Sequence, residues 1–161
     1  MEARLTPLYA IFKLNSQLFL NTLDGMDDDR ASWRPTGQTN SAAWVALHLV
    51  DTRYFMATHI SLTLVNPFAA MLKDARSIGD LRTLPRLEEV RTAWKHVTGE
   101  ARVRFGQMTE AHLDVMASAK LPTDDASTLG MLSFLMHHES YHIGQLGLLR
   151  KQMGLPAMTY R

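Results

Sequence analysis

The residues best suited to chemistry in this sequence are histidines in the segment HHESYHIGQ, residues 137–145. His138 and His142 are four residues apart, and on a helix this spacing places their rings on one side, with about 5–6 Å between the β-carbons. The isolated His96 and His112 have no partner at such a spacing. The chain has no cysteine, so histidine, aspartate and glutamate are the available metal ligands. The His138 and His142 pair can therefore converge on one metal ion.

The helix expected around this segment carries both histidines on its apolar face. At 100° per residue, that face consists of Met131, Leu135, His138, His142, Leu146, Leu149 and Met153, with Phe134 and Gln145 at its edge. An imidazole buried there with unpaired nitrogens costs about 1–3 kcal/mol, so both rings need partners. His137 points away from this face and is expected at the surface or in an interface. The pattern leaves two interpretations open, a metal site and a hydrogen-bonded pair of core histidines.

A third ligand is expected from the segment SAAWVALHLVDTRYF, residues 41–55. One helical stripe of this region holds Trp44, His48, Thr52, Phe55, His59 and Leu62. His48 and His59 lie about 16 Å apart along a helix, too far to share one ion with nitrogen bonds of about 2.0–2.1 Å. His48 is the better candidate because Trp44 and Phe55 flank it on a face of core character. We expect His59 to be structural or exposed.

The same residues also match the zinc-protease motif H-E-x-x-H, in which the glutamate, here Glu139, acts as general base. The common protease patterns take a third ligand further along the chain. The segment after His142 contains no His, Asp or Glu, and no strand for aligning a peptide is recognisable. We therefore interpret the protease match as a coincidence of spacing.

Four long helical segments are expected to position these histidines, over about residues 5–23, 42–65, 87–108 and 127–153. Asn40 or Ser41 can cap the second segment, and Ser127 can cap the fourth, by accepting hydrogen bonds from free backbone amides. Gly25 and Gly154 are suited to follow the first and fourth helices, because glycine tolerates the left-handed conformation found there. These signals place both histidine segments inside helices.

The second helix is expected to stop before Pro67, because proline disfavours helical geometry at the preceding residue, Asn66. No segment is convincing as a strand, and no internal repeat is visible. We therefore expect an all-α fold, an antiparallel four-helix bundle with one longer crossover connection. The connectors 67–86 and 117–126 are long enough to cover a site on the bundle.

Composition excludes several classes of protein. The chain has 161 residues, of which 46% are apolar and 20% charged, as expected for one globular domain. Its net charge of +1 provides no global field for a phosphate backbone, so nucleic acid is not an expected partner. The most apolar stretch, residues 60–72, is too short to span a membrane. The N-terminus lacks the features of a signal peptide, and a cytoplasmic location is expected.

The chain resembles the DinB/YfiT-like family over essentially all of residues 1–161. The motifs that carry the resemblance are WRP at 33–35, NSAAWVALHLVDTRYF at 40–55 and HHESYHIGQLGLLRKQMGLP at 137–156. The resemblance implies a four-helix bundle, often a homodimer, with a metal triad whose positions match His48, His138 and His142. Many members have arginine after the last histidine, whereas this chain has Ile143, so a role for such an arginine is not carried over.

The resemblance also implies a metal-dependent enzyme that acts on a small-molecule substrate. In family branches that use low-molecular-weight thiols such as bacillithiol or mycothiol, the metal activates the thiolate for S-transfer or isomerisation. Three histidines equally suit a metal-bound water for hydrolysis of a small substrate. Zinc and nickel both accept imidazole ligands, and the residues do not choose between them.

Three further residues are candidates for roles beside the metal. Gln145 lies on the histidine side of its helix, where it could bind a metal-bound water or substrate, or equally cap a buried polar group. Asp51 and Glu139 could orient a ligand or transfer a proton. For both carboxylates, a surface salt bridge is the interpretation we favour.

Two non-enzymatic functions remain open at this point. The first is a non-catalytic stress-response or metal-binding structural protein in which the ion joins the second helix to the fourth. The second is a bundle without metal whose apolar cleft binds an organic ligand. Its lining would be aromatic, with Trp44, Tyr54, Phe134 and Tyr141 as candidates.

Overall fold

The computed structural model describes residues 1–75, 77–81 and 83–160. Within these residues it consists of helices, with one isolated bridge between Met116 and Ser127 and no named strand, so the expected all-α fold class is confirmed. The elements are η1 (Ala3–Leu5), α1 (Thr6–Leu23), α2 (Asp28–Ser32), α3 (Ala42–His59), α4 (Ala69–Leu72), η2 (Ile78–Asp80), α5 (Leu87–Gln107), α6 (Glu110–Leu113) and α7 (Thr128–Gln152). Among the described helices, none has the length and apolar character needed to cross a membrane.

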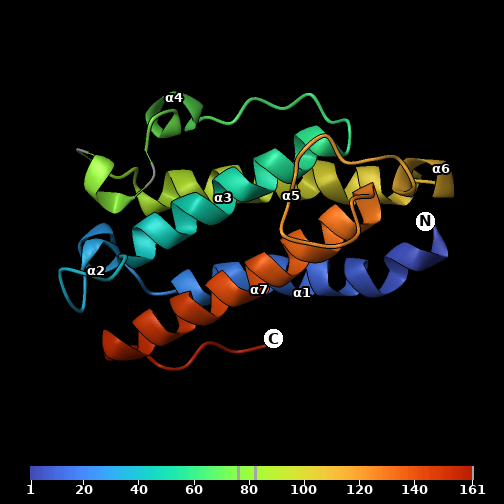
Figure 1. Ribbon diagram of the computed structural model, residues 1–161. Coiled ribbons are helices and arrows are strands. Elements are labelled where there is room, and N and C mark those ends of the chain that lie inside the picture. The colour runs from blue at the N-terminus through green and yellow to red at the C-terminus, as the bar shows by residue number, and fades with distance from the viewer. Residues whose placement is uncertain (76, 82, 161) are drawn as a thin grey trace.

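The long helices α1 and α7 lie side by side and run in the same direction (Figure 1). The side-chain amide of Asn15 donates to the carbonyl of Met136 over 3.2 Å, and further along both helices Arg150 donates to the carbonyl of Thr22 over 3.4 Å. Residue numbers therefore increase together along this pair. The first and last helices of the chain form one half of the bundle.

The helices α3 and α5 form the other half and are also parallel (Figure 1). Arg53 Nη1 donates to Thr98 Oγ1 over 2.7 Å, and Arg104 Nε donates to the carbonyl of Ile60 over 2.7 Å. The connection between the two helices therefore returns along the bundle, which is the longer crossover expected from the sequence. Across the two halves, α7 is antiparallel to α3 and α5 is antiparallel to α1.

The ends of the helices follow local sequence signals. Ser41 caps α3 and Ser127 caps α7, each through a side-chain oxygen that accepts from a backbone amide over 3.2 Å. Gly25 after α1 and Gly154 after α7 have φ angles of 70° and 76°. In this left-handed region a side chain would be strained, which explains why glycine stands at both positions. Three of these four positions were expected from the sequence alone, and Ser41 resolves the choice for the second helix.

The end of α3 differs from the expectation. The helix ends at His59 rather than at residue 65. Ser61 adopts a φ of 65°, and the amide of Leu62 donates to the carbonyl of Ala57 over 2.9 Å, which closes the helix in a Schellman motif. Such a motif normally uses glycine, so the serine gave no signal in the sequence. The short helices α2, α4 and η2 were also not expected.

The buried core has two apolar clusters along the bundle, and a polar layer separates them. One cluster contains Phe19, Leu47 and Trp94, and the other contains Phe12 and Phe105. The layer between them consists of buried residues from all four long helices, namely Asn15, Ser16, Arg53, Thr98 and Glu139. Every buried side-chain polar atom among the described residues has a hydrogen-bond partner.

Candidate metal centre

Three histidines from α3 and α7 meet at the surface of the bundle. His48 Nε2 lies 3.0 Å from His138 Nε2. The ring of His142 is centred 4.8 Å from that of His48 and 4.4 Å from that of His138. One candidate ligand atom from each residue lies within 4.8 Å of the other two. The structure thus brings together the three histidines that spacing and resemblance singled out, all of them half-buried.

The environment of these rings favours their neutral form. The pKa of His48 is lowered to about 4, mainly by burial and in smaller part by the neighbouring His142 and His138. Burial is also the main cause that lowers the pKa of His138 and of His142. A neutral imidazole has a lone pair on one ring nitrogen, and that lone pair is what a metal ion binds. Near neutral pH, each of the three neutral rings can therefore offer a lone pair to a cation.

Gln145 determines how the ring of His142 is oriented. Its side-chain oxygen lies 2.7 Å from His142 Nδ1. Because an amide oxygen only accepts, Nδ1 carries the proton, and the lone pair of the neutral ring is on Nε2. Of the two roles left open by the sequence, this contact favours pairing with a half-buried polar group, here a histidine of the cluster. Such outer partners fix the tautomer of metal-binding histidines.

Asp51 lies beside the cluster, in a pocket of about 230 Å³ that His138 also lines. Burial raises the pKa of its carboxyl group, and a hydrogen bond of 2.7 Å from Asn66 opposes that shift. The surface salt bridge favoured from the sequence is therefore not what holds Asp51. The remaining wall of the pocket is mainly apolar, with Phe55 and Phe134 among its residues.

Glu139 is also not in a surface salt bridge. It is 1% exposed, and both of its carboxylate oxygens bind the guanidinium of Arg53, over 2.8 Å and 2.5 Å. Arg53 is itself fully buried, between the rings of Phe12 and Trp94 at 4.6 Å and 3.5 Å from the ring centres. A carboxylate held in this way cannot act as the general base of the H-E-x-x-H motif, which agrees with our rejection of the protease.

Arg53 is the main structural residue near the site that sequence reasoning missed. Besides Glu139, it donates through Nη1 to Ser16 and Thr98 over 2.9 Å and 2.7 Å. The available signal was a charged residue inside a largely apolar helical segment, five residues after His48. A charge in such a position has to find a buried partner.

The other histidines of the two helices lie apart from the cluster. His59 Nδ1 donates to the carbonyl of Phe55 over 2.8 Å, and His137 is exposed, as expected for both.

Of the two long connectors, the second contributes Leu121 to the pocket beside His138. The first contributes Phe68 to a different pocket.

The four aromatic residues considered for a ligand cleft do not line one cavity. Trp44 and Tyr54 are buried in the core at 8% and 4% exposure. Phe134 stacks on the ring of His138 with 5.8 Å between ring centres, and Tyr141 is 59% exposed. Only Phe134 lines the pocket beside the histidines. The geometry thus does not support a metal-free aromatic cleft built from these four residues.

Fold and site together define a class, namely helical-bundle proteins with three histidines from two helices grouped so that they could hold one metal ion. The sequence profile of the DinB superfamily matches residues 11–146. The chain therefore belongs to the DinB superfamily.

Solved structures share this fold. A DinB-like protein from Bacillus cereus ATCC 10987 is 16% identical, with a TM-score of 0.72 over 94% of both chains. A DinB-like protein from Bacillus subtilis is also 16% identical, with a TM-score of 0.62 over 97% of this chain and 95% of that chain. A search of curated proteins gave no match. At this identity the two structures establish the fold alone.

Proposed function

We propose that this chain is a metal-dependent enzyme that holds one divalent ion through His48, His138 and His142 and acts on a small substrate. The observation that carries the proposal is the convergence of three ligand nitrogens within 4.8 Å. Structural zinc sites normally have four protein ligands, whereas catalytic sites keep an open position. Among the described residues, no fourth ligand joins the group. Zinc and nickel are the expected ions, because both accept imidazole.

The reaction we propose is thiol-dependent S-transfer or isomerisation, with hydrolysis of a small substrate as the alternative chemistry. When bound, the ion would lower the pKa of a coordinated thiol or water, which would then supply the nucleophile. The chain has no cysteine, so the thiol is a separate low-molecular-weight molecule. Asp51 shares a pocket with His138, and its raised pKa supports a role in holding or delivering a proton. The apolar wall of that pocket suits an apolar part of the substrate.

The first experiment measures metal content in untagged protein. Wild type is compared with His48→Ala, His138→Ala and His142→Ala by elemental analysis after loading with zinc or nickel. His59→Ala and His137→Ala are matched controls, because they lie on the same two helices outside the cluster. We expect about one ion per chain in wild type and in both controls, and loss of the ion in the three cluster variants. Full metal content in the cluster variants would contradict the proposal.

The second experiment separates an enzyme from a structural metal protein. Loaded wild type is assayed with small thiols and an electrophilic substrate, and with small esters, against the metal-free protein and His142→Ala. We expect a rate that needs both metal and an intact cluster. If metal raises the melting temperature but no rate exceeds that of the metal-free protein, the ion instead joins α3 to α7, as in the non-catalytic alternative.

A homodimer and a cytoplasmic location are also proposals. Exposed apolar side chains on the adjacent helices α1 and α7 support self-association. They are Ile11, Leu14, Tyr141 and Leu148, between 39% and 60% exposed. Light scattering after gel filtration tests the dimer, and Leu148→Lys is expected to give a monomer because it places a charge at one of these exposed apolar positions.

A further inference from the structure

A second pocket lies at the end of the bundle where α3 and α5 finish and α6 lies (Figure 1). Its volume is about 240 Å³, and its lining includes Ile60, Arg104, Met108, His112 and Val115. It is separate from the histidine cluster. The pocket lies beyond the C-terminal end of α3, and His59 at that end is about 16 Å along the helix from His48.

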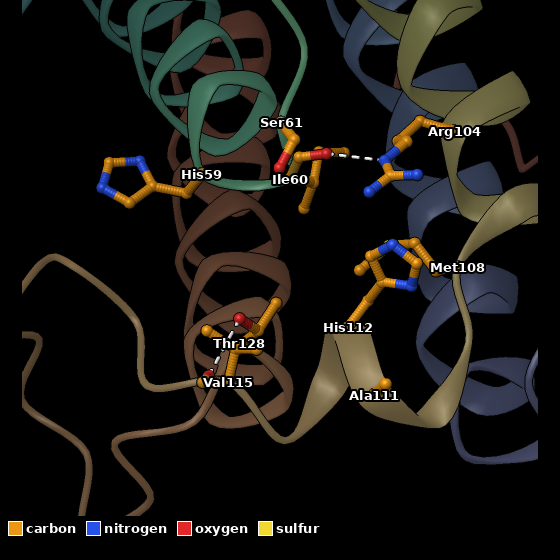
Figure 2. A pocket seen from close by; sticks show the side chains of 9 residues that line it. All are labelled: His59, Ile60, Ser61, Arg104, Met108, Ala111, His112, Val115 and Thr128. Atoms are coloured by element: carbon orange, nitrogen blue, oxygen red, sulfur yellow. Dashed lines mark hydrogen bonds between the residues drawn. The ribbon is translucent and has the colours of Figure 1, made fainter.

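Arg104 supplies free hydrogen-bond donors to this pocket. Its Nε donates to the carbonyl of Ile60 over 2.7 Å, which fixes the side chain across the end of α3. The terminal nitrogens Nη1 and Nη2 have no partner in the described part of the chain, and Figure 2 shows the guanidinium above the ring of His112. No acidic residue lines the pocket within the described residues. No carboxylate of the described lining therefore pairs with the guanidinium.

His112 adds a hydrogen-bond donor, and its contacts show which ring nitrogen carries the proton. The backbone amide of Thr109 donates to His112 Nδ1 over 3.2 Å. Because an amide N–H can only donate, Nδ1 is the acceptor, and the proton of the neutral ring is on Nε2. The ring extends from α6 toward the guanidinium of Arg104, whereas His59 points away from both (Figure 2). Two sets of donors thus face the same space, and an acceptor is the missing partner.

The apolar residues of the lining and the pocket volume indicate the size and the apolar part of the ligand. Met108, Ala111 and Val115 are apolar and line the same pocket. The volume is slightly below the range of about 300–1,000 Å³ typical of drug-sized ligands. We propose that this pocket binds a small organic carboxylate, with its oxygens between Arg104 and His112 and a short apolar body against Met108 and Val115. Arginine suits such a ligand because its planar fork matches the two oxygens of a carboxylate.

The test is a titration of metal-free protein with butyrate at constant ionic strength, followed by backbone amide NMR shifts. Butyramide has nearly the same shape without the charge, and acetate has the charge with a shorter body. We expect saturable shifts centred on α6 and the end of α5, with butyrate binding more tightly than acetate and butyramide not binding. Butyramide binding as tightly as butyrate would overturn the proposal, and so would tighter binding of inorganic phosphate.

Variants identify the residues responsible. Arg104→Gln is expected to weaken butyrate binding roughly tenfold or more, because it removes the fork and its charge. Arg102→Gln is the charge-matched control, because Arg102 is exposed on the same helix and lines a different pocket. Equal weakening by both variants would show nonspecific attraction and would refute the site. His112→Asn, which removes the Nε2 donor and retains an acceptor for Thr109, tests the site independently if Arg104→Gln does not fold.

This inference does not depend on the proposed metal chemistry. Butyrate binding is expected to be unchanged in His48→Ala, which lacks one of the proposed metal ligands. Loss of binding in His48→Ala would place the carboxylate at the histidine cluster and would overturn the second site. Loss of metal without loss of butyrate binding in His48→Ala would support a carboxylate site separate from the histidine cluster.

Discussion

The carboxylate of Glu139 binds the guanidinium of Arg53 inside the bundle, although Glu139 follows a histidine of the candidate metal centre directly in the sequence. On α7, Glu139 is 100° around the helix from His138, so the two side chains project from different sides of the helix. His138 lies at the edge of the bundle, whereas Glu139 is in the polar layer that connects the four long helices. One helix thus carries a candidate reactive surface and, one residue further on, the central ion pair of the core.

Removing one member of this pair is expected to destabilise the fold. Glu139→Gln leaves the charge of Arg53 buried without compensation, which costs about 3–5 kcal/mol. The double variant Arg53→Met/Glu139→Leu is expected to lose less than the sum of the single variants, because it removes both charges. Urea unfolding measures these changes. Glu100→Gln, at an exposed position on α5, is the control and is expected to change stability by less than about 0.5 kcal/mol.

Gln145 is expected to affect metal affinity without being a ligand. Gln145→Leu removes the acceptor for His142 Nδ1 and frees the ring to change tautomer. We expect metal affinity to fall about 10–100-fold, as is usual for such outer partners. Gln145→Glu keeps an acceptor at the same place and is expected to retain affinity. Competition with a chromogenic chelator measures both, and equal affinity of the leucine variant and wild type would refute the positioning role.

The metal-free protein is expected to lose stability on acidification. The folded pKa of His48, about 4, lies below its ordinary value of 6.5, so the unfolded state binds a proton first as the pH falls. The stability contributed by neutral His48 is complete well above pH 6.5 and is lost progressively down to about pH 4, by about 3 kcal/mol in all. Unfolding at several pH values measures this slope, and the slope should be shallower in His48→Leu. An equal slope in that variant would assign the effect to other groups.

Ser61 offers a test of the unexpected end of α3. Its φ of 65° is a conformation that glycine adopts without strain. Ser61→Gly is therefore expected to stabilise the protein by about 0.5–1 kcal/mol. Ser133→Gly, inside α7, is the matched control and should destabilise by a similar amount, because glycine is unfavourable in a helix interior. Thermal unfolding of both variants measures the contrast, and destabilisation by Ser61→Gly would contradict the proposed strain.

The amino-acid sequence by itself determined the features that depend on local geometry. The spacing of His138 and His142 placed both rings on one side of a helix, and Ser127 with Gly154 set where that helix begins and ends. These features could be predicted because they need only the helical repeat and the few residues next to each end. His48 could be chosen as the third histidine from its apolar face and from the family resemblance.

Only the tertiary structure decided which distant residues meet. Arg53 and Glu139 are 86 residues apart, and nothing local to either predicts their ion pair. The parallel direction of α3 and α5 also depends on how the crossover returns along the bundle. The distance of 3.0 Å between His48 and His138 likewise follows from the packing of α3 against α7. Helical periodicity fixes where a side chain points on its own helix, but packing alone determines what it faces.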